Sequence, residues 1–348
     1  MDVASCKLDG NADVVEFCPQ QNFHHILAAA TYTLEEGTRP NRSGSISLFS
    51  ADSNMGLELL HRIQTIGVFD IKWNAPGSTE HPLLAQADAD GCLTLYCLQL
   101  NDNSTSGIDL SEVCTEKVSP AMCLCVDWNP SSSSVSLGLS DGSICIASVR
   151  ESQLQISQSW VAHGYEVWAT AFDISTPQLL YTGSDDCRFN CWDLREDPSS
   201  LVFQNAKSHK MGVCCFAQSP MNSNILLTGS YDEFLRVWDL RSMSKPVSKY
   251  SLCLGGGVWR LKNHPSIEGL VLAACMHNGF AIVRVGDESA DIMESYTKHE
   301  SLAYGADWQR TECVQASTER GSFVATCSFY DQLLRIWKPE SLIVKPGY

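Results

Sequence analysis

The sequence predicts an all-β, single-domain β-propeller of seven four-stranded blades, and three observations support this. First, the phrase Leu-Leu-Tyr-Thr-Gly-Ser…Trp-Asp-Leu-Arg ends at Arg195 and returns, closely similar, 46 residues later at Arg241. Second, a turn signal, mostly Asp-Gly or a relative of it, recurs at intervals of 47, 51, 45, 46, 46 and 53 residues. Third, short alternating apolar runs lie between Gly, Asn, Asp and Ser turns, and no long helical period competes with them.

Seven turn positions define seven blades. The turns begin at Ser43, Asp90, Asp141, Asp186, Asp232, Asn278 and Asp331. We expect the blades at approximately 13–60, 61–100, 118–155, 160–202, 207–250, 255–295 and 299–345, with an insertion around 311–321. Inner strands are expected at 68–73, 123–128 and 167–172, each ending near an aromatic residue. Residues 3–8 should form the outer strand of the last blade, which removes an exposed sheet edge; residues 342–344 are the alternative.

Composition narrows the class of protein and its partners. The net charge of −16 opposes binding to nucleic acid, because phosphates would be repelled, and it suits a cationic substrate or a basic partner. The 16 cysteines are dispersed and include no Cys-x-x-Cys pair, so we expect free thiols in a reducing cytoplasm and no metal site. No apolar run is long enough to span a membrane, and no secretory signal is visible. A cytoplasmic monomer without a cofactor is expected.

The repeat also carries a His, Ser and Asp set that resembles a catalytic triad. In each copy the histidine stands 23 residues before the turn aspartate. The same spacing is typical of the hydrogen-bond relay within each blade of WD-repeat propellers, and an active site would rarely be duplicated, so we expect architecture here. The two sets are His163, Ser184, Asp186 and Trp192, and His209, Ser230, Asp232 and Trp238.

Two further motifs suggest other functions. Gly138-Leu-Ser-Asp-Gly142 matches a nucleophile elbow, but it lies in a strand-turn-strand context where the elbow requires a strand followed by a helix. Arg195 and Arg241 complete Trp-Asp-x-Arg boxes like those of substrate receptors in cullin-4 ubiquitin ligases, where the arginine reaches the ligase adaptor. The alternative for both arginines is a local salt bridge.

The second half of the chain contains motifs that the repeat does not require. These are Gly255-Gly-Gly-Val-Trp-Arg260, His264-Pro265, Leu272-Ala-Ala-Cys-Met-His-Asn-Gly-Phe280, Leu302-Ala-Tyr-Gly-Ala-Asp-Trp308 and Ala325-Thr-Cys-Ser-Phe-Tyr-Asp331. At these points the chain closely resembles the WD-repeat diphthine methyl ester hydrolases, most strongly over residues 163–337. The resemblance implies hydrolysis of a methyl ester on a modified histidine of translation elongation factor 2, its protein partner, with release of methanol. The alternative is a non-catalytic adaptor.

Candidate site residues follow from the geometry of a propeller. The residue before each turn aspartate and the start of each inner strand meet at one end of the central axis. An ester hydrolase needs a base or nucleophile and donors for the oxyanion, and the substrate that the resemblance implies carries a trimethylammonium group. The catalytic candidates are His277, Tyr304 and Tyr330, with Cys275 as a weaker nucleophile. The substrate-binding candidates are Asp70, Glu166, Trp168, Asp185, Tyr231, Trp259 and Arg260.

Overall fold

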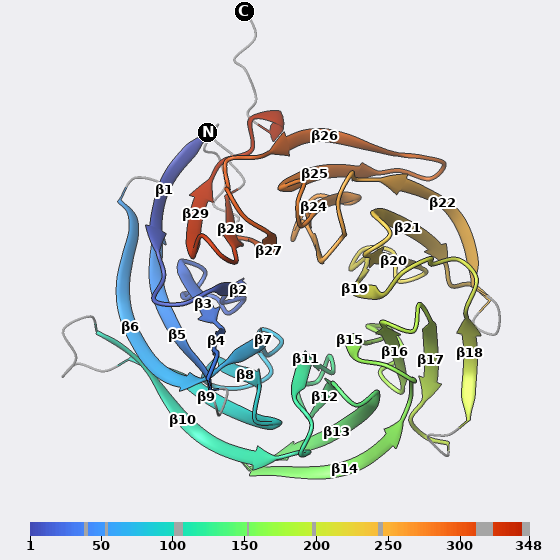
Figure 1. The fold of residues 1–348 in the computed structure, drawn as a ribbon, viewed down its shortest axis with the longest axis horizontal. Coiled ribbons are helices and arrows are strands. Elements are labelled where there is room, and N and C mark those ends of the chain that lie inside the picture. The colour runs from blue at the N-terminus through green and yellow to red at the C-terminus, as the bar shows by residue number, and fades with distance from the viewer. Residues whose placement is uncertain are drawn as a thin grey trace, which may run out of the picture.

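The computed structural model describes residues 1–37, 41–52, 55–100, 107–151, 153–196, 200–242, 246–310 and 323–342. Seven sheets stand around a common axis like the blades of a propeller, as the sequence predicts (Figure 1). All seven inner strands run the same way along the axis, so the molecule has two distinct ends. We name them the start face, where the inner strands begin, and the end face, where they finish. Turns between second and third strands lie at the start face.

The strands follow one another outward from the axis in each blade. Blade one has β2 (Ala12–Phe17), β3 (Ile26–Thr31), β5 (Asn41–Asp52) and β6 (Gly56–Ile66), with β4 (Thr33–Glu35) added against β5. Blade two has β7 (Val68–Trp73), β8 (Leu83–Asp88), β9 (Cys92–Leu100) and β10 (Ile108–Lys117). Blade three has β11 (Cys123–Trp128), β12 (Ser134–Leu139), β13 (Ser143–Arg150) and β14 (Gln153–Val161). Blade two therefore extends past the boundary at residue 100 that the sequence suggests.

The second half of the ring repeats this arrangement. Blade four has β15 (Val167–Phe172), β16 (Leu179–Ser184), β17 (Phe189–Asp193) and β18 (Leu201–Asn205). Blade five has β19 (Val213–Gln218), β20 (Ile225–Ser230), β21 (Phe234–Asp239) and β22 (Val247–Cys253). Blade six has β23 (Arg260–Asn263), β24 (Leu270–Ala274), β25 (Phe280–Val285) and β26 (Ala290–Tyr296). Blade seven has β27 (Ala303–Trp308), β28 (Val324–Ser328), β29 (Leu333–Trp337) and β1 (Asp2–Lys7), with a 3₁₀ turn at Glu340–Leu342 behind it.

The N-terminal strand β1 completes the last blade. It pairs antiparallel with β29, from Asp2 opposite Trp337 to Lys7 opposite Leu333. Leu8 is buried directly after the strand, and its amide donates to the carbonyl of Gln332 at 2.8 Å. The ring is thus closed by two segments from opposite ends of the sequence. Of the alternative tail strand at 342–344, Leu342 ends the 3₁₀ turn and the other two residues lie outside the described residues, as does the insertion at 311–321.

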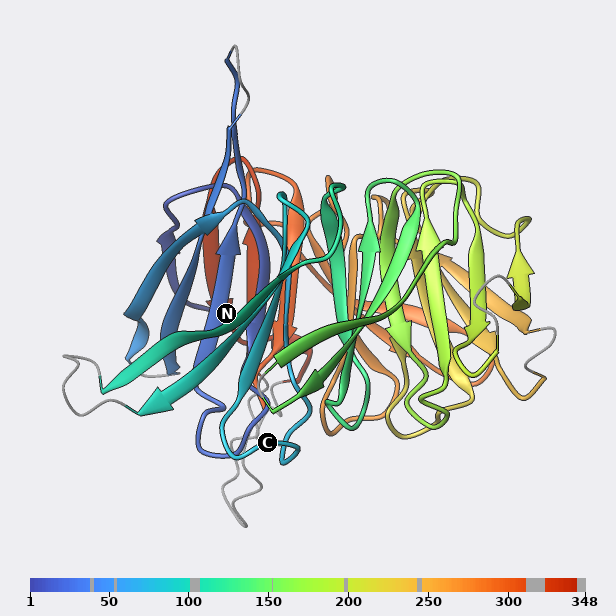
Figure 2. The ribbon, with the colours of Figure 1, turned by 90° about the horizontal axis from the view of Figure 1, so that it is seen from below.

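Blade one departs from the predicted turn at Ser43-Gly44. Both residues lie inside β5, because β4 and β5 extend the hairpin beyond the sheet, and Ser43 pairs with Thr33 (Figure 2). Gly44 is needed for close packing instead of for a turn: a Cβ there would lie 2.2 Å from the carbonyl oxygen of Thr31. The turn signal was wrong at this blade because glycine serves both purposes.

The core lies between neighbouring sheets. Val14, Ile26 and Ile46 of blade one pack with Val68 and Ile71 of blade two, and all five are at most 2% exposed. At the end face, a tryptophan closing an inner strand donates its indole N–H to a backbone carbonyl of the preceding blade. The pairs are Trp73 to Glu16 at 3.2 Å, Trp128 to Lys72 at 2.9 Å and Trp308 to Lys262 at 3.0 Å.

The link from histidine to tryptophan in each relay is a threonine, and the predicted serines, Ser184 and Ser230, accept from the amides of Asp186 and Asp232, each at 3.2 Å. In blade four, Thr182 Oγ1 lies 2.8 Å from His163 Nε2 and accepts from Trp192 Nε1 at 2.9 Å. His163 Nδ1 lies 3.0 Å from Asp186. The hydroxyl of Ser184 instead donates to the carbonyl of Tyr165 at 3.1 Å, because Ser184 is the last residue of β16, two residues closer to the turn than Thr182.

Blade five keeps the threonine and changes the rest. Thr228 contacts His209 Nε2 at 2.9 Å and accepts from Trp238 at 3.0 Å. Asp232, however, pairs with Arg236 at 2.7 Å. Burial, reinforced by Arg236, lowers the pKa of His209 to about 3, so this histidine stays neutral. Both relays are therefore part of the fold.

Candidate functional site

A repeated irregularity at the start face shapes the candidate site. The register of the inner strand shifts just after its first residue in β2, β7, β11, β15, β19 and β27, which leaves the second residue unpaired. Such bulges re-aim a side chain relative to the sheet. The residues at this position are Asp13, Phe69, Leu124, Trp168, Cys214 and Tyr304, and Trp259 takes the equivalent place directly before β23.

Four aromatic side chains from consecutive blades meet at this face, and we call them the aromatic arc: Trp168, Tyr231, Trp259 and Tyr304. The ring of Trp259 lies at its centre, with centroid distances of 5.5 Å to Trp168, 5.7 Å to Tyr231 and 4.8 Å to Tyr304. All four side chains are half-buried, so part of each ring remains accessible. The sequence-predicted aromatic residues are therefore brought together.

One predicted carboxylate, Asp185, lies against the aromatic arc, and a second, Glu166, belongs to the loop two residues before Trp168. The amide of Asp185 donates to the carbonyl of Glu166 at 3.0 Å, which joins the start of blade four to its own turn. Gly212 lies against this pair, since a Cβ there would be 2.5 Å from Asp185 Oδ1 and 3.1 Å from the ring of Tyr231. A glycine thus allows Asp185 to approach the arc. Glu166 is half-buried and Asp185 exposed.

A buried ion pair lies deeper along the axis. Arg260 Nη1 is 2.9 Å from Asp70 Oδ1, with side-chain exposures of 17% and 7%. The other oxygen of Asp70 accepts from the amide of Val126 at 3.1 Å. These two predicted substrate-binding residues therefore form an ion pair with each other. The Nε atom of Arg260 has no hydrogen-bond partner among the described residues.

Asp13 is the residue that the sequence analysis missed. It is 4% exposed, and its Oδ1 atom has no hydrogen-bond partner in the part of the chain that the structure describes. Burial raises the pKa of Asp13 to about 8, with Asp70 adding to the shift and Arg260 opposing it. Aligning the inner strands would have placed Asp13 in the same register as Trp168, Trp259 and Tyr304.

The predicted catalytic residues are less closely grouped. His277 is exposed in the turn after β24, and its side chain makes no hydrogen bond, ion pair or ring contact with the described residues. Tyr330 is 70% exposed and touches the arc through Phe329, whose centroid is 5.0 Å from Tyr330 and 5.2 Å from Tyr304. Burial raises the pKa of the Cys275 thiol to about 12, which disfavours the nucleophilic thiolate.

The two Trp-Asp-x-Arg arginines form local pairs. Arg195 lies 2.7 Å from Asp193, and Arg241 pairs with Asp239 in the same way at 2.5 Å. Their side chains are 66% and 76% exposed, on blades four and five. Binding to a ligase adaptor remains a prediction for these residues, since the local pair accounts for their geometry.

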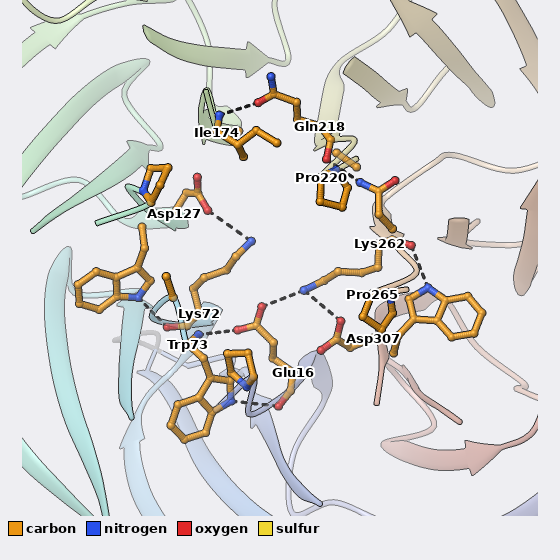
Figure 3. A pocket seen from close by; sticks show the side chains of 18 of the residues that line it. Glu16, Lys72, Trp73, Asp127, Ile174, Gln218, Pro220, Lys262, Pro265 and Asp307 are labelled. Carbon is orange, nitrogen blue, oxygen red and sulfur yellow. Dashed lines mark hydrogen bonds and ion pairs between the residues drawn. The ribbon is translucent and has the colours of Figure 1, made fainter. Parts of the chain in front are cut away.

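A second group of charges surrounds a cavity of about 510 Å³ at the end face (Figure 3). Lys262 Nζ lies 2.9 Å from Glu16 and 3.5 Å from Asp307, and Lys72 Nζ lies 3.4 Å from Asp127. Burial alone would raise the pKa of Glu16, but Lys262 and Lys72 hold it below its usual range. Each charged residue stands just before the last residue of its inner strand, a pattern that could have been read from the sequence.

These carboxylates are also bound to the backbone of the next blade. Glu16 accepts from the amide of Trp73 at 2.7 Å, and Asp127 accepts from Phe172 at 2.9 Å. Asp307 accepts from Phe17 at 2.8 Å. Both oxygens of each carboxylate are thereby engaged, so the cluster holds neighbouring blades together. The start face, with its unpartnered polar atoms, is the better candidate for chemistry.

Neither end offers a metal centre within the described ranges. No group of three His, Cys, Asp or Glu side chains there is placed to hold a metal ion. A search of the same residues for a helix long and apolar enough to cross a bilayer finds none.

Comparisons with known proteins agree with the fold and indicate a family. The WD domain, G-beta repeat family matches residues 154–193 and 202–239. The human protein named diphthine methyltransferase is 35% identical over 331 residues, covering 85% of this chain and 72% of its own length. A Dictyostelium discoideum homolog of diphthine methyltransferase is 32% identical, covering 95% of this chain and 97% of that protein. A chain in the crystal structure of the mitotic checkpoint complex has a TM-score of 0.72 at 18% identity, covering 97% of this chain and 92% of its own, which shows shared architecture alone.

Proposed function

Since this chain belongs to the diphthine methyltransferase family, we propose that it hydrolyses the methyl ester of diphthine methyl ester on a modified histidine of translation elongation factor 2. Membership gives the chain a role in diphthamide biosynthesis. In the proposed reaction, water attacks the ester carbonyl, the methyl group leaves as methanol, and diphthine with a free carboxylate remains. The elongation factor is the protein partner.

The observation that carries this proposal is the aromatic arc with its two carboxylates. The modified histidine bears a trimethylammonium group, which cannot donate a hydrogen bond and is best held by aromatic faces and negative charge. Trp168 and Tyr231 offer partly exposed rings on either side of Trp259, Asp185 lies near Tyr231, and Glu166 precedes Trp168 by two residues in the chain. Each ring contributes about 0.5–2 kcal/mol to binding a quaternary ammonium. At the opposite end of the axis, the cluster of Glu16, Lys72, Asp127, Lys262 and Asp307 has its charges already paired.

Tyr304 is the best placed of the proposed oxyanion donors. Its ring stacks on Trp259 at an interplanar angle of 25°. Burial is the main cause that raises the pKa of Tyr304, and the negative charge of nearby Asp13 adds to it. The hydroxyl of Tyr304 therefore stays protonated and able to donate. Tyr330 is proposed as a second donor at the rim, and His277 as a base that would approach from solvent.

The direct test is hydrolysis of the isolated protein substrate. We expect the purified chain, mixed with elongation factor 2 carrying diphthine methyl ester, to release methanol. Intact-mass measurement of the elongation factor should show the loss of one CH₂ at the modified histidine. An unchanged mass after prolonged incubation with the folded chain would refute the proposed reaction.

Removing the centre of the aromatic arc should weaken substrate binding. For Trp259→Ala we expect KM for the methyl-ester substrate to rise about 30-fold, since roughly 2 kcal/mol of ring contact with the cation is lost. Glu166→Gln should raise KM less, because the side chain is half-buried and solvent screens its charge. The measurement is steady-state methanol release at several substrate concentrations.

Trp160→Ala is the matched control for the aromatic substitution. Trp160 is also half-buried and also packs on another tryptophan, Trp192, at 5.5 Å, but it lies on the outer strand of blade three. Its replacement should leave KM unchanged. If Trp259→Ala and Glu166→Gln both kept the KM of the parent chain, the arc would not be the cation site.

A further inference from the structure

We propose that Asp13 is the general base of the ester hydrolysis and takes the proton from the attacking water. This inference rests on the proposed function and adds to it a catalytic residue on blade one. Asp13 is the second residue of β2, in the register that supplies Trp168, Trp259 and Tyr304 to the aromatic arc. The repeated bulge thus brings one carboxyl group to the same level of the axis as the rings.

Asp13 differs from the other inner-strand carboxylates in its bonding. Asp70, Glu16, Asp127 and Asp307 each accept a backbone amide of the following blade and each face a cation. Asp13 Oδ1 is buried and, among the described residues, accepts no hydrogen bond. A buried oxygen without a partner costs stability unless something else binds it. A water molecule held for reaction fills that need.

Donors without partners lie at the same end of the axis. The indole nitrogens of Trp168 and Trp259 and the Nε atom of Arg260 are all buried and unpaired within the described part of the chain. Each can donate to negative charge and none can accept. A lone acceptor and several lone donors at one end of the axis are what ester hydrolysis requires: a base for the water and donors for the carbonyl oxygen as it gains charge.

Charged and titratable groups around Asp13 keep its carboxyl a good base. Asp70 on β7, Tyr304 on β27, Cys327 on β28 and Tyr231 at the turn after β20 all interact with it. Arg260, the first residue of β23, is the one cation among the described residues that does so. Burial is the largest influence and raises the pKa of Asp13 to about 8. A carboxylate whose pKa lies near working pH takes up a proton more readily than an ordinary one.

The step balances with water as the second reactant. Asp13 removes a proton from water while the oxygen attacks the ester carbonyl, and the carbonyl π electrons move onto its oxygen, stabilised by Arg260 and Tyr304. Collapse of this tetrahedral intermediate breaks the bond to the methoxy oxygen. The proton on Asp13 passes to that oxygen, so methanol leaves, the acid is formed and Asp13 is regenerated.

The test is the pH dependence of Asp13→Asn. For the parent chain, kcat/KM should rise about tenfold per pH unit and level off near pH 8, because the base must be ionised. Asp13→Asn should lower kcat at pH 8 by about 10²- to 10⁴-fold and lose this profile. Asp13→Glu, which keeps the carboxyl, should recover part of the rate. Asp173→Asn is the matched control: Asp173 is equally buried at 4%, but it binds the hydroxyl of Tyr181 outside the aromatic arc.

A second readout requires no substrate. The pKa of Asp13 is higher in the folded chain than in the unfolded chain, so folding takes up a proton and stability falls as pH rises toward about 8. Asp13→Asn removes this loss, so its melting temperature should exceed that of the parent chain at pH 8 and the difference should shrink toward pH 4. A melting temperature lowered equally at both pH values would contradict the buried, unpaired state of Asp13.

The outcomes separate the two proposals. If the parent chain released no methanol, the proposed function would fail whatever Asp13 does. If the parent chain were active and Asp13→Asn kept its rate and its pH profile, the assignment of the base would be overturned. Loss of activity in His277→Ala alone, with Asp13→Asn unchanged, would assign the base to His277 instead.

Discussion

Arg260→Met is expected to lower the free energy of unfolding by about 3–5 kcal/mol at pH 8, the cost of leaving a buried charge without its partner. Arg260 pairs with Asp70 at 2.9 Å and is only 17% exposed. It also opposes the rise in the pKa of Asp13. Methionine fills a similar volume, so the loss reports charge and not a cavity.

The effect should depend on pH in one direction. Without Arg260, the pKa of Asp13 rises further. Protonation of Asp13 at lower pH then removes one of the negative charges that Arg260 compensates in the parent chain. Urea unfolding should therefore show a smaller loss at pH 5 than at pH 8. The double variant Arg260→Met, Asp70→Asn should recover part of the stability, because the pair acts as a unit. An equal loss at both pH values would mean that Arg260 does not act through Asp13.

Removing residues 1–8 is the second large expected effect. We expect a loss of about 5 kcal/mol and a fall in Tm of roughly 10 °C, since the ladder with β29 and the buried Leu8 are both lost. The exposed edge of β29 should also promote association between chains. Thermal unfolding and size-exclusion chromatography measure the two effects.

Adding the missing strand as a peptide provides the control. A peptide of residues 1–8 should restore the melting temperature and the monomeric elution volume, and a scrambled peptide of the same composition should restore neither. If the shortened chain matched the parent in both measurements, β1 would not be holding the ring closed.

The sequence was sufficient to predict the repeat and insufficient where one residue type serves two purposes. The inner strands at 68–73, 123–128 and 167–172 coincide with β7, β11 and β15, because alternation and a terminal aromatic residue report burial directly. Gly44 misled because glycine marks close packing as well as turns. Thr182 was overlooked because threonine is also an ordinary strand residue, and only the distance to His163 shows its role.

For the candidate site, the sequence predicted the aromatic residues and missed Asp13. Trp259 and Tyr304 stood out because the repeat does not ask for them. Asp13 lies in a short apolar strand without a motif, and its significance comes from neighbours supplied by four other blades, which lie near one another only after the ring closes. Burial and the missing hydrogen bond are properties of the assembled ring, and no pattern within one blade contains them.

Pairing of the first strand with the last has a consequence for folding during synthesis. Lys7 leaves the ribosome long before Leu333, its partner across the ladder. At about 5–20 residues per second, β1 waits roughly 15–70 s before its partner strand exists. Blades one to six can each assemble from contiguous chain during that time. The nascent protein therefore carries an unpaired strand through most of its synthesis, and this interval is when a chaperone that shields an edge strand would matter most.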